Sequence, residues 1–395
     1  MTEVLRGIRI VEQGTFITGP CAGMMLADLG ADVIKVEAPE GDPYRSYQGG
    51  AYSPHFQAYN RNKRSIALDL KKSFDRDLFD GLVREADVYI QNFRPGTAER
   101  LGAGVDRLRQ LNPGLVYCSI SGFGSSGPYV DRPSYDSVAQ ALSGFLSVVV
   151  DTERPRFLGP ALADAITGIY ASYGTLGALL ERSRTGRGSL VEVSMLEAMA
   201  HFALEPFAAF FALGETPKSS DRPRLAQAYI LRTSDRRLVA IHLSSLEKFW
   251  QGLVSAIGDP ALGADARFGT RQARIDHYEA LGTELDAQFS RQPLAHWSRV
   301  LGEHDVPFAP INGIDQVVND PQVRHLGLIV PTQAPHGADR AVRPAVQFGG
   351  KRAAHVRAAP LLDQDGRAIR MAVASGERWP AAVRTASDSP VAADS

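Results

Sequence analysis

One acidic residue lies where a carboxylate could act as a nucleophile. Asp164 stands at the start of a long helical pattern, 163–183, directly after a stretch rich in Gly, Pro and Ser, 122–160. The first turn of a helix has unpaired backbone N–H groups and the positive end of the helix dipole, so we expect Asp164 to be ionised and held in place. A capping acid without chemistry has the same pattern. The residue alone leaves both interpretations open.

Other residues with titratable side chains are weaker candidates. Tyr135 and Asp136 lie in the motif PSYD, ahead of Asp164. Tyrosine is a poor base at neutral pH, because its reference pKa is about 10. His55 and His242 titrate near neutral pH, but this property alone does not indicate function, and neither is assigned a role.

Composition excludes several classes of function. Cys21 and Cys118 are the only cysteines, without the Cys/His spacings of a zinc site, and we expect both to be buried packing residues. The net charge of −1 lacks the long-range attraction of a nucleic-acid or anionic-membrane binder. The start, MTEVLRGIRIVEQG, has too short an apolar run for a signal sequence or membrane span. We expect a cytoplasmic protein without metal, nucleic-acid or membrane partners.

The elements that position these residues follow an α/β pattern. A chain of 395 residues is long enough for two substructures. In its N-terminal half, short β-branched runs alternate with helical patterns, which predicts βαβ units and a mostly parallel, doubly wound sheet. The Gly-, Pro- and Ser-rich stretch would then lie where such sheets bind ligands. The predicted strands of this sheet are 8–12, 32–37, 65–70, 87–93, 115–121 and 189–195.

Glycines in the helix that follows predict close packing. Gly168, Gly174 and Gly177 lie within 163–183, and each costs up to about 1 kcal/mol relative to alanine in a helix interior. We therefore expect this helix to pack against another backbone or a ligand. A further helix is predicted after the strand 189–195 and runs through about Leu213.

The order and content of six motifs resemble the family III CoA-transferases, which include formyl-CoA:oxalate and carnitine CoA-transferases and, in a side branch, the α-methylacyl-CoA racemases. The motifs are collinear over nearly the whole chain. They are GIRIVEQGTFITGPCAGMMLADLGADVIKVEAPEGDPYR, NRNKRSIALDLK, QNFRPGTAERLG, SISGFGSSGPYVDRPSYDSVAQALSG, ADAITGIYASYGTLGALLERSRTGRGSLVEVSMLEAM and DVPFAPINGIDQVVNDPQV.

The resemblance implies a large Rossmann-like α/β domain built from both chain ends, a smaller α/β domain between them, and an interlocked homodimer. Combined with the composition of the chain, it predicts five segments. They are a large coenzyme A (CoA)-binding domain (1–213), a linker (214–224), a small domain (225–313), a return to the large domain (314–380) and a disordered tail (381–395).

The activity implied is transfer of CoA from an acyl-CoA donor to a carboxylic acid acceptor. The resemblance makes Asp164 the covalent nucleophile, with Tyr135 and Asp136 beside it, and CoA a substrate rather than a bound cofactor. No metal and no permanently bound cofactor is expected. By the same resemblance, the residues that contact CoA or line the site near the thioester are Phe16, Ile17, Thr18, Leu68, Asp69, Leu70, Lys71, Asn92, Phe93, Arg94 and Arg100.

CoA carries a diphosphate and a 3′-phosphate, so its site needs cations and backbone donors. The motif NRNKRS supplies Arg61, Lys63 and Arg64, and Lys71 follows the next strand. Any one of these cations is more often part of a solvated surface. As a set at strand ends, they favour a phosphate-bearing ligand.

Three other functions remain open. A racemase or epimerase of the side branch would have His where Tyr135 stands, which favours the transferase. A dinucleotide-binding protein would have G-x-G-x-x-G after the first strand, but the turn reads GTFITGP. A non-catalytic CoA-binding protein would not need Asp164.

The chain differs from some members of the resembled family at positions that bear on substrate choice. Formyl-CoA:oxalate enzymes have Gln where Ile17 stands and a run of glycines that is absent from 215–250 here. We therefore expect an acceptor other than oxalate, either a larger acyl group or a substituted dicarboxylate. The identities of donor and acceptor do not follow from the sequence.

Overall fold

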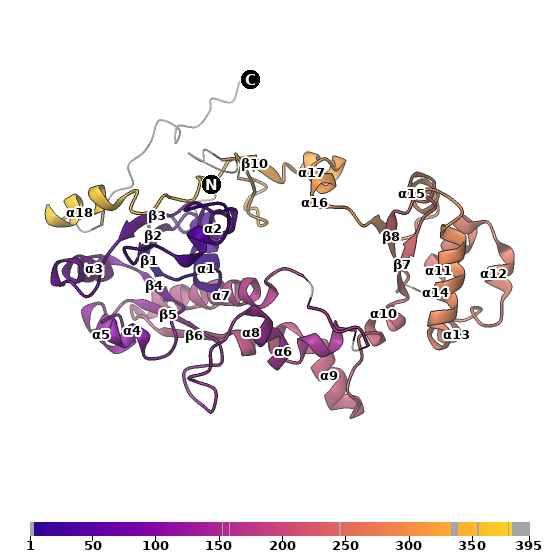
Figure 1. Cartoon of the computed structure of the whole chain (residues 1–395), viewed down its shortest axis with the longest axis horizontal. Coiled ribbons are helices and arrows are strands. Elements are labelled where there is room, and N and C mark those ends of the chain that lie inside the picture. Colours follow the sequence, from indigo (N-terminus) through magenta and orange to yellow (C-terminus); the bar gives the residue numbers. More distant parts are fainter. Residues whose placement is uncertain are drawn as a thin grey trace, which may run out of the picture. The chain divides into compact units, whose positions relative to one another are not determined.

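The N-terminal β-branched runs form a six-stranded parallel sheet with the order β3-β2-β1-β4-β5-β6 (Figure 1). This computed structural model describes residues 4–151, 153–157, 159–244, 246–332, 339–353, 355–377 and 379–380. The predicted α/β class is confirmed, and the six predicted strands are present with ends shifted by up to three residues. Their bounds are β1 (Arg9–Gln13), β2 (Asp32–Glu37), β3 (Arg64–Ala67), β4 (Val88–Gln91), β5 (Val116–Ser121) and β6 (Leu190–Ser194).

Backbone contacts divide the chain into two units. Unit 1 consists of Met1–Phe145, Phe157–Leu204 and His325–Ser395, and unit 2 of Leu146–Arg156 and Glu205–Arg324. Unit 1 therefore draws on both ends of the chain. The predicted domain boundaries after 213 and 313 lie several residues away from these limits and stay predictions. The predicted tail, 381–395, lies outside the described residues.

Helices cover both faces of the sheet in unit 1 (Figure 1). On one face, α3 (Ser73–Glu85), α5 (Val105–Leu111) and α18 (Gly366–Ala374) pack on buried residues of the strands. On the other face lie α1 (Thr18–Asp28) and α7 (Leu162–Thr185). Strands buried on both sides explain why these segments are β-branched runs rather than alternating patterns.

Close packing of α7 is confirmed for two of its three glycines. A Cβ on Gly168 would lie 2.6 Å from Cβ of Cys21 on α1, and one on Gly174 would lie 2.8 Å from Val191. Gly177 has no atom within 4 Å of its Cβ position among the described residues, so for that position close packing stays a prediction. The small residues at the first two positions let α7 approach α1 and β6 closely.

The predicted helix ending near Leu213 is two helices, α8 (Met195–Phe202) and α9 (Leu204–Leu213). Pro206 lacks an N–H group, so it cannot donate the helical bond that would continue α8. No single described helix is long and apolar enough to cross a membrane, and only this bent pair, taken together, reaches that length and composition.

The remaining described elements of unit 1 are short. They are the 3₁₀ helices η1 (Pro43–Ser46) and η2 (Phe145–Val148, which ends in unit 2), α2 (Pro54–Asn60), α4 (Thr97–Arg100), α6 (Asp136–Leu142) and the antiparallel pair β10 (Ile329–Pro331) and β11 (Arg340–Val342).

Unit 2 has its own apolar core. Its antiparallel sheet contains β7 (Ala228–Arg232), β8 (Leu238–His242) and β9 (Phe308–Pro310). Phe289 and Trp297 stack in the core with ring centroids 4.1 Å apart. The helices are α10 (Asp221–Ala226), α11 (Leu246–Ile257), α12 (Pro260–Ala264), α13 (Arg271–Asp276), α14 (Tyr278–Phe289), α15 (Leu294–Glu303), α16 (Ile314–Val317) and α17 (Pro321–Leu326, which ends in unit 1).

Candidate active site

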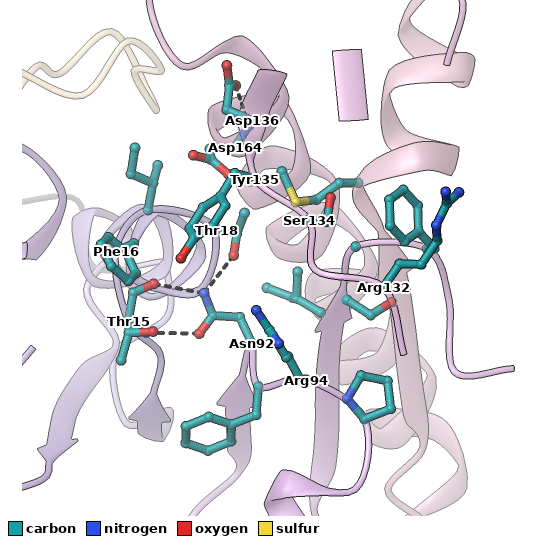
Figure 2. Close-up of a pocket in the computed structure, with 18 of the residues that line it drawn as sticks. Thr15, Phe16, Thr18, Asn92, Arg94, Arg132, Ser134, Tyr135, Asp136 and Asp164 are labelled. Atoms are coloured by element: carbon teal, nitrogen blue, oxygen red, sulfur yellow. Dashed lines mark hydrogen bonds between the residues drawn. The ribbon is translucent and has the colours of Figure 1, made fainter. Parts of the chain in front are cut away.

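A cavity of about 540 Å³ lies in unit 1 at the carboxyl ends of β1 and β4. The strand order reverses between these two strands, and open α/β sheets bind ligands at such a point. Figure 2 shows acidic residues at one end of the cavity and Arg94 toward the other. The lining includes nine of the predicted site residues: Phe16, Ile17, Thr18, Asn92, Phe93, Arg94, Tyr135, Asp136 and Asp164.

Asn92 fixes the loop that follows β1. Its Oδ1 accepts a hydrogen bond from the backbone N–H of Thr15 at 2.9 Å. Its Nδ2 donates to the Thr15 carbonyl and to Oγ1 of Thr18, both at 2.8 Å (Figure 2). One amide therefore ties the end of β4 to the loop after β1 and shapes one wall of the cavity.

Asp164 lies in the first turn of α7 and lines the cavity. Burial raises the pKa of its carboxyl from the ordinary 3.8 to about 7, and the charge of Asp136 adds to this rise. The expectation that the helix start keeps Asp164 ionised was wrong. The N–H groups expected to stabilise it are engaged elsewhere, and desolvation disfavours the charged form.

The side chain of Asp136 accepts hydrogen bonds from backbone N–H groups in the first turn of α7. Its Oδ1 accepts from the backbone N–H of Ala163 at 2.7 Å and of Asp164 at 3.3 Å. Its Oδ2 accepts from Nε2 of Gln140 at 2.6 Å. Asp136 therefore caps α7 from a different segment of the chain and sets where the Asp164 carboxyl lies.

Tyr135 and Phe16 form an aromatic edge of the cavity. Their ring centroids lie 6.2 Å apart in a nearly perpendicular arrangement, and the ring of Tyr44 lies 5.8 Å from that of Phe16. Tyr135 is 61% exposed, so its hydroxyl remains available to a ligand. Asp164 itself is partly buried, and this burial reduces the contact of its carboxyl with water.

Three cations expected to bind phosphates instead form ion pairs. The Nζ of Lys63 lies 2.6 Å from Glu12, with both side chains fully buried. Arg61 and Arg64 pair with acids of α1 and β2, Asp28 and Asp32, each at 2.6 Å. The prediction was wrong for these three residues, because acids distant in sequence neutralise them.

The other predicted CoA contacts lie beyond the residues that line the cavity. Leu68 and Leu70 are buried in the core, so only their backbone could face a ligand. The Oδ1 of Asp69 accepts from the backbone N–H of Lys71 at 3.1 Å. Lys71 and Arg100 are exposed, and a guanidinium nitrogen of Arg100 donates to Oγ1 of Thr97 at 2.7 Å.

Several lining residues were missed by sequence reasoning. Arg132 is an exposed cation whose guanidinium lies 4.3 Å from the centre of the Tyr129 ring. The Asp-Pro pair before Tyr44 is a capping signal that predicts a short helix there. The missed lining residues include Tyr44, Tyr47, Phe123, Arg132, Ser134 and Met195.

The remaining candidates do not add chemistry to this cavity. His55 contacts Gln48 and packs against Tyr47, and it is not among the lining residues. His242 is hydrogen-bonded to Ser244 in unit 2. Cys21 and Cys118 are buried, as expected. No group of three His, Cys, Asp or Glu side chains suited to a metal ion occurs in the described part of the chain.

Comparisons with known proteins agree over nearly the full length. A model of CoA-transferase family III matches residues 5–366. An acetyl-CoA:oxalate CoA-transferase from Acetobacter aceti is 33% identical, over 94% of this chain and 96% of its own. A succinate–glutarate CoA-transferase from Agrobacterium fabrum is 34% identical, over 84% and 86%. The crystal structure of a CaiB/BaiF family protein from Brucella suis has a TM-score of 0.84 at 33% identity, covering 94% of this chain and 99% of that one.

Proposed function

The chain belongs to CoA-transferase family III, and we propose that it transfers CoA through covalent intermediates on Asp164. It is an enzyme that moves CoA between an acyl-CoA and a carboxylic acid. The observation that carries the proposal is the placement of the Asp164 carboxyl on the cavity wall, in an apolar setting that raises its pKa to about 7. A desolvated carboxylate is a stronger nucleophile than a hydrated one.

The proposed reaction begins with the donor. A carboxylate oxygen of Asp164 attacks the thioester carbonyl carbon, the C–S bond breaks, and CoA leaves as a thiolate. The product is a mixed anhydride between Asp164 and the donor acyl group. The thiolate then attacks the aspartyl carbonyl carbon, which forms an aspartyl-CoA thioester and releases the donor as a free carboxylate.

The second half repeats these steps with the acceptor. The acceptor carboxylate attacks the aspartyl-CoA thioester and releases the thiolate, leaving a second mixed anhydride. Attack of the thiolate on the acceptor carbonyl gives the new acyl-CoA and restores the Asp164 carboxylate. Overall, one thioester and one carboxylate are exchanged for another thioester and carboxylate of similar energy. Water must be kept from the anhydrides, and the rings of Phe16, Tyr44 and Tyr135 support that requirement.

We assign the CoA phosphates to exposed cations around the cavity. Arg94 lines it, and neither a hydrogen bond nor an ion pair occupies its guanidinium among the described residues. Lys71 and Arg100 are exposed on neighbouring segments. Arginine donors bind phosphate oxygens in pairs, which makes these residues suitable for a diphosphate and a 3′-phosphate.

We propose an acceptor larger than oxalate. Ile17, Phe16 and Met195 line the cavity near Asp164 and favour apolar surface on the substrate. A relative from Acetobacter aceti bears oxalate in its name, so oxalate belongs in an acceptor screen beside longer and substituted dicarboxylates. Transfer to oxalate faster than to all of these would contradict this part of the proposal.

Trapping the intermediate tests the mechanism. The enzyme is incubated with an acyl-CoA without acceptor, quenched and digested, and the peptide that contains Asp164 is examined by mass spectrometry. We expect a CoA adduct on that peptide and none in Asp164→Asn. Absence of the adduct, with transfer intact in Asp164→Asn, would overturn the proposal. Incubating a chiral 2-methylacyl-CoA in heavy water tests racemase activity, and we expect no exchange of its α-proton.

A further inference from the structure

Phe16, on the cavity wall, has a left-handed backbone conformation with φ of 58°. Such a conformation is uncommon for a bulky residue and persists only where surrounding contacts hold it. The ring of Phe16 lies between those of Tyr44 and Tyr135. The shape of this wall therefore depends on whatever fixes the Phe16 backbone.

One carboxylate oxygen fixes it. Oδ1 of Asp42 accepts from the backbone N–H of Phe16 at 3.1 Å and from that of Tyr44 at 2.9 Å. The two aromatic residues thus share one acceptor. Asp42 is 2% exposed and is not among the residues that line the cavity.

A buried chain of charges holds Asp42 in turn. Oδ2 of Asp42 lies 3.0 Å from Nζ of Lys35, which lies 3.1 Å from Oε1 of Glu12. Oε2 of Glu12 lies 2.6 Å from Nζ of Lys63. The side chains of Lys35, Glu12 and Lys63 are fully buried, so solvent does not compete for these contacts.

The same chain of charges fixes both ends of the loop. Lys35 donates to the carbonyl of Gly14 at 2.7 Å, and Glu12 accepts from the N–H of Gly14 at 3.0 Å. Lys63 donates to the carbonyl of Pro20 at 2.8 Å. The charged groups therefore hold the backbone before and after Phe16, while none of them lines the cavity.

We propose that Asp42 is a positioning residue for the acyl-CoA site. It holds the Phe16 backbone in the left-handed conformation, which the loop would otherwise exchange for one with negative φ. The proposal rests on the function proposed above. An ordinary buried ion-pair residue would affect the stability of the fold alone. Asp42, by contrast, should affect CoA binding, and only by changing the conformation of Phe16.

A double-mutant cycle tests that route, with equilibrium binding of CoA by calorimetry as the readout. Asp42→Ser keeps a capping hydroxyl for Tyr44 but is too short to hold Phe16 and Lys35 together. We expect Asp42→Ser to weaken CoA binding about tenfold. In the Phe16→Gly background, where the left-handed conformation is freely accessible and the ring is gone, the same change should alter binding less than twofold.

Additive effects in the two backgrounds would overturn the proposal. If Asp42→Ser does not fold, Asp42→Asn replaces it in the same cycle; it retains Oδ1 but loses the charge, and we expect a threefold effect that again disappears with Phe16→Gly. The matched control is Asp80→Asn, which weakens the ion pair between Asp80, a buried residue, and Arg107, a partly exposed one, in the same unit. It should lower stability without changing CoA affinity.

Binding of CoA does not require turnover. The covalent role of Asp164 and the positioning role of Asp42 can therefore be contradicted independently. Transfer that survives Asp164→Asn contradicts the covalent mechanism and leaves the cycle interpretable. An additive cycle with a trapped Asp164 adduct contradicts only the role of Asp42.

Discussion

Asp136 caps the helix that presents Asp164, with its Oδ1 accepting from the backbone N–H groups of Ala163 and Asp164 at 2.7 and 3.3 Å. One carboxylate thus orients the other while its charge opposes ionisation of the neighbour. Burial is the larger cause of the raised pKa of Asp164, and Asp136 is the second. The arrangement couples the position of the proposed nucleophile to its pKa, which gives separate tests of geometry and charge.

The charge of Asp136 should appear in the pH profile. Asp164 must lose its proton to attack, so kcat/KM should rise with pH through about 7. Asp136→Asn keeps the Oδ1 acceptor but removes the charge, which lowers the pKa of Asp164. The acid limb should then move to lower pH and raise the ratio of activity at pH 6 to that at pH 8 about twofold to fivefold.

Asp136→Ala provides the matched control for this profile. It removes the charge and also the cap on α7, so it should lower kcat/KM at every pH in addition to shifting the limb. A profile for Asp136→Asn that coincides with that of the wild type would show that the charge of Asp136 does not act on the ionising group.

Asp164 should also reduce the stability of the folded chain at high pH. Its folded pKa of about 7 exceeds the ordinary value of 3.8, so folding retains a proton between these values and stability falls as pH rises through them. Asp164→Asn removes this penalty. For Asp164→Asn we expect the free energy of unfolding to increase on the order of 2 kcal/mol at pH 8 and to be unchanged near pH 3. The value follows from the difference between the folded and unfolded pKa, reduced because the carboxyl is partly exposed to solvent. Urea unfolding at both pH values measures the difference, and an equal gain at both would contradict the pKa assignment.

The buried ion cluster beneath the cavity should be sensitive to loss of one member. Burial acts to raise the pKa of Glu12, but the charges of Lys35 and Lys63 outweigh it and the pKa is lowered. Glu12→Gln removes the acidic partner of Lys63 and leaves Lys35 with Asp42, and we expect a loss of about 3–5 kcal/mol in the free energy of unfolding. Urea unfolding gives this value directly.

A partly exposed ion pair supplies the control for that loss. Arg9 and Glu85 lie 3.2 Å apart with 38% and 30% of their side chains exposed. Glu85→Gln should cost less than about 1 kcal/mol. A loss of similar size for Glu12→Gln would show that the buried cluster contributes no more than a surface pair.

The main architecture was predictable from local patterns. Runs such as 32–37 carry β-branched residues, at 33, 34 and 36, because both faces of the sheet are covered, and this pattern can be recognised from the sequence alone. The position of Asp164 at the start of α7 was predictable from the change to a helical period after the Gly-, Pro- and Ser-rich stretch.

Ion pairing and pKa depend on distant contacts and were not predictable. Lys63 looks like a solvent-exposed cation in NRNKRS, but Glu12 lies 51 residues earlier in the sequence and neutralises it. Burial lowers the pKa of Lys63 to about 8, and no local pattern carries that information. Likewise the cap that Asp136 supplies to α7 spans 27 residues, so the direction of the pKa shift of Asp164 could not be read from its own helix.

Exposed cations should affect binding more than chemistry. Lys71→Gln and Arg100→Gln should each raise KM for acyl-CoA about threefold to tenfold with a smaller change in kcat, because contacts to phosphates remote from the carbonyl stabilise substrate and transition state alike. Lys72→Gln is the adjacent control, since Lys72 is 72% exposed and lies 3.8 Å from Asp69. Steady-state kinetics measure the split. Unchanged KM in both Lys71→Gln and Arg100→Gln would place CoA elsewhere.

Each unit carries large apolar side chains that face solvent. Tyr173 on α7 is 74% exposed in unit 1, and Phe211 on α9 is 77% exposed in unit 2. Large apolar side chains that face solvent on each unit suggest surfaces covered by another chain. The open space beside Gly177 on α7 would allow a partner backbone to approach. We propose the homodimer that the family resemblance implies, in which the two chains interlock.

Interlocked chains cannot separate without substantial unfolding, so the dimer mass should persist on dilution. With a chain mass of 42.7 kDa, light scattering and mass photometry should both give about twice that value. The same mass is expected at nanomolar concentration and in 1 M salt, because salt weakens surface ion pairs but does not unthread a chain. A folded monomer that regains the dimer mass on concentration, without a denaturation and refolding step, would exclude the interlocked arrangement.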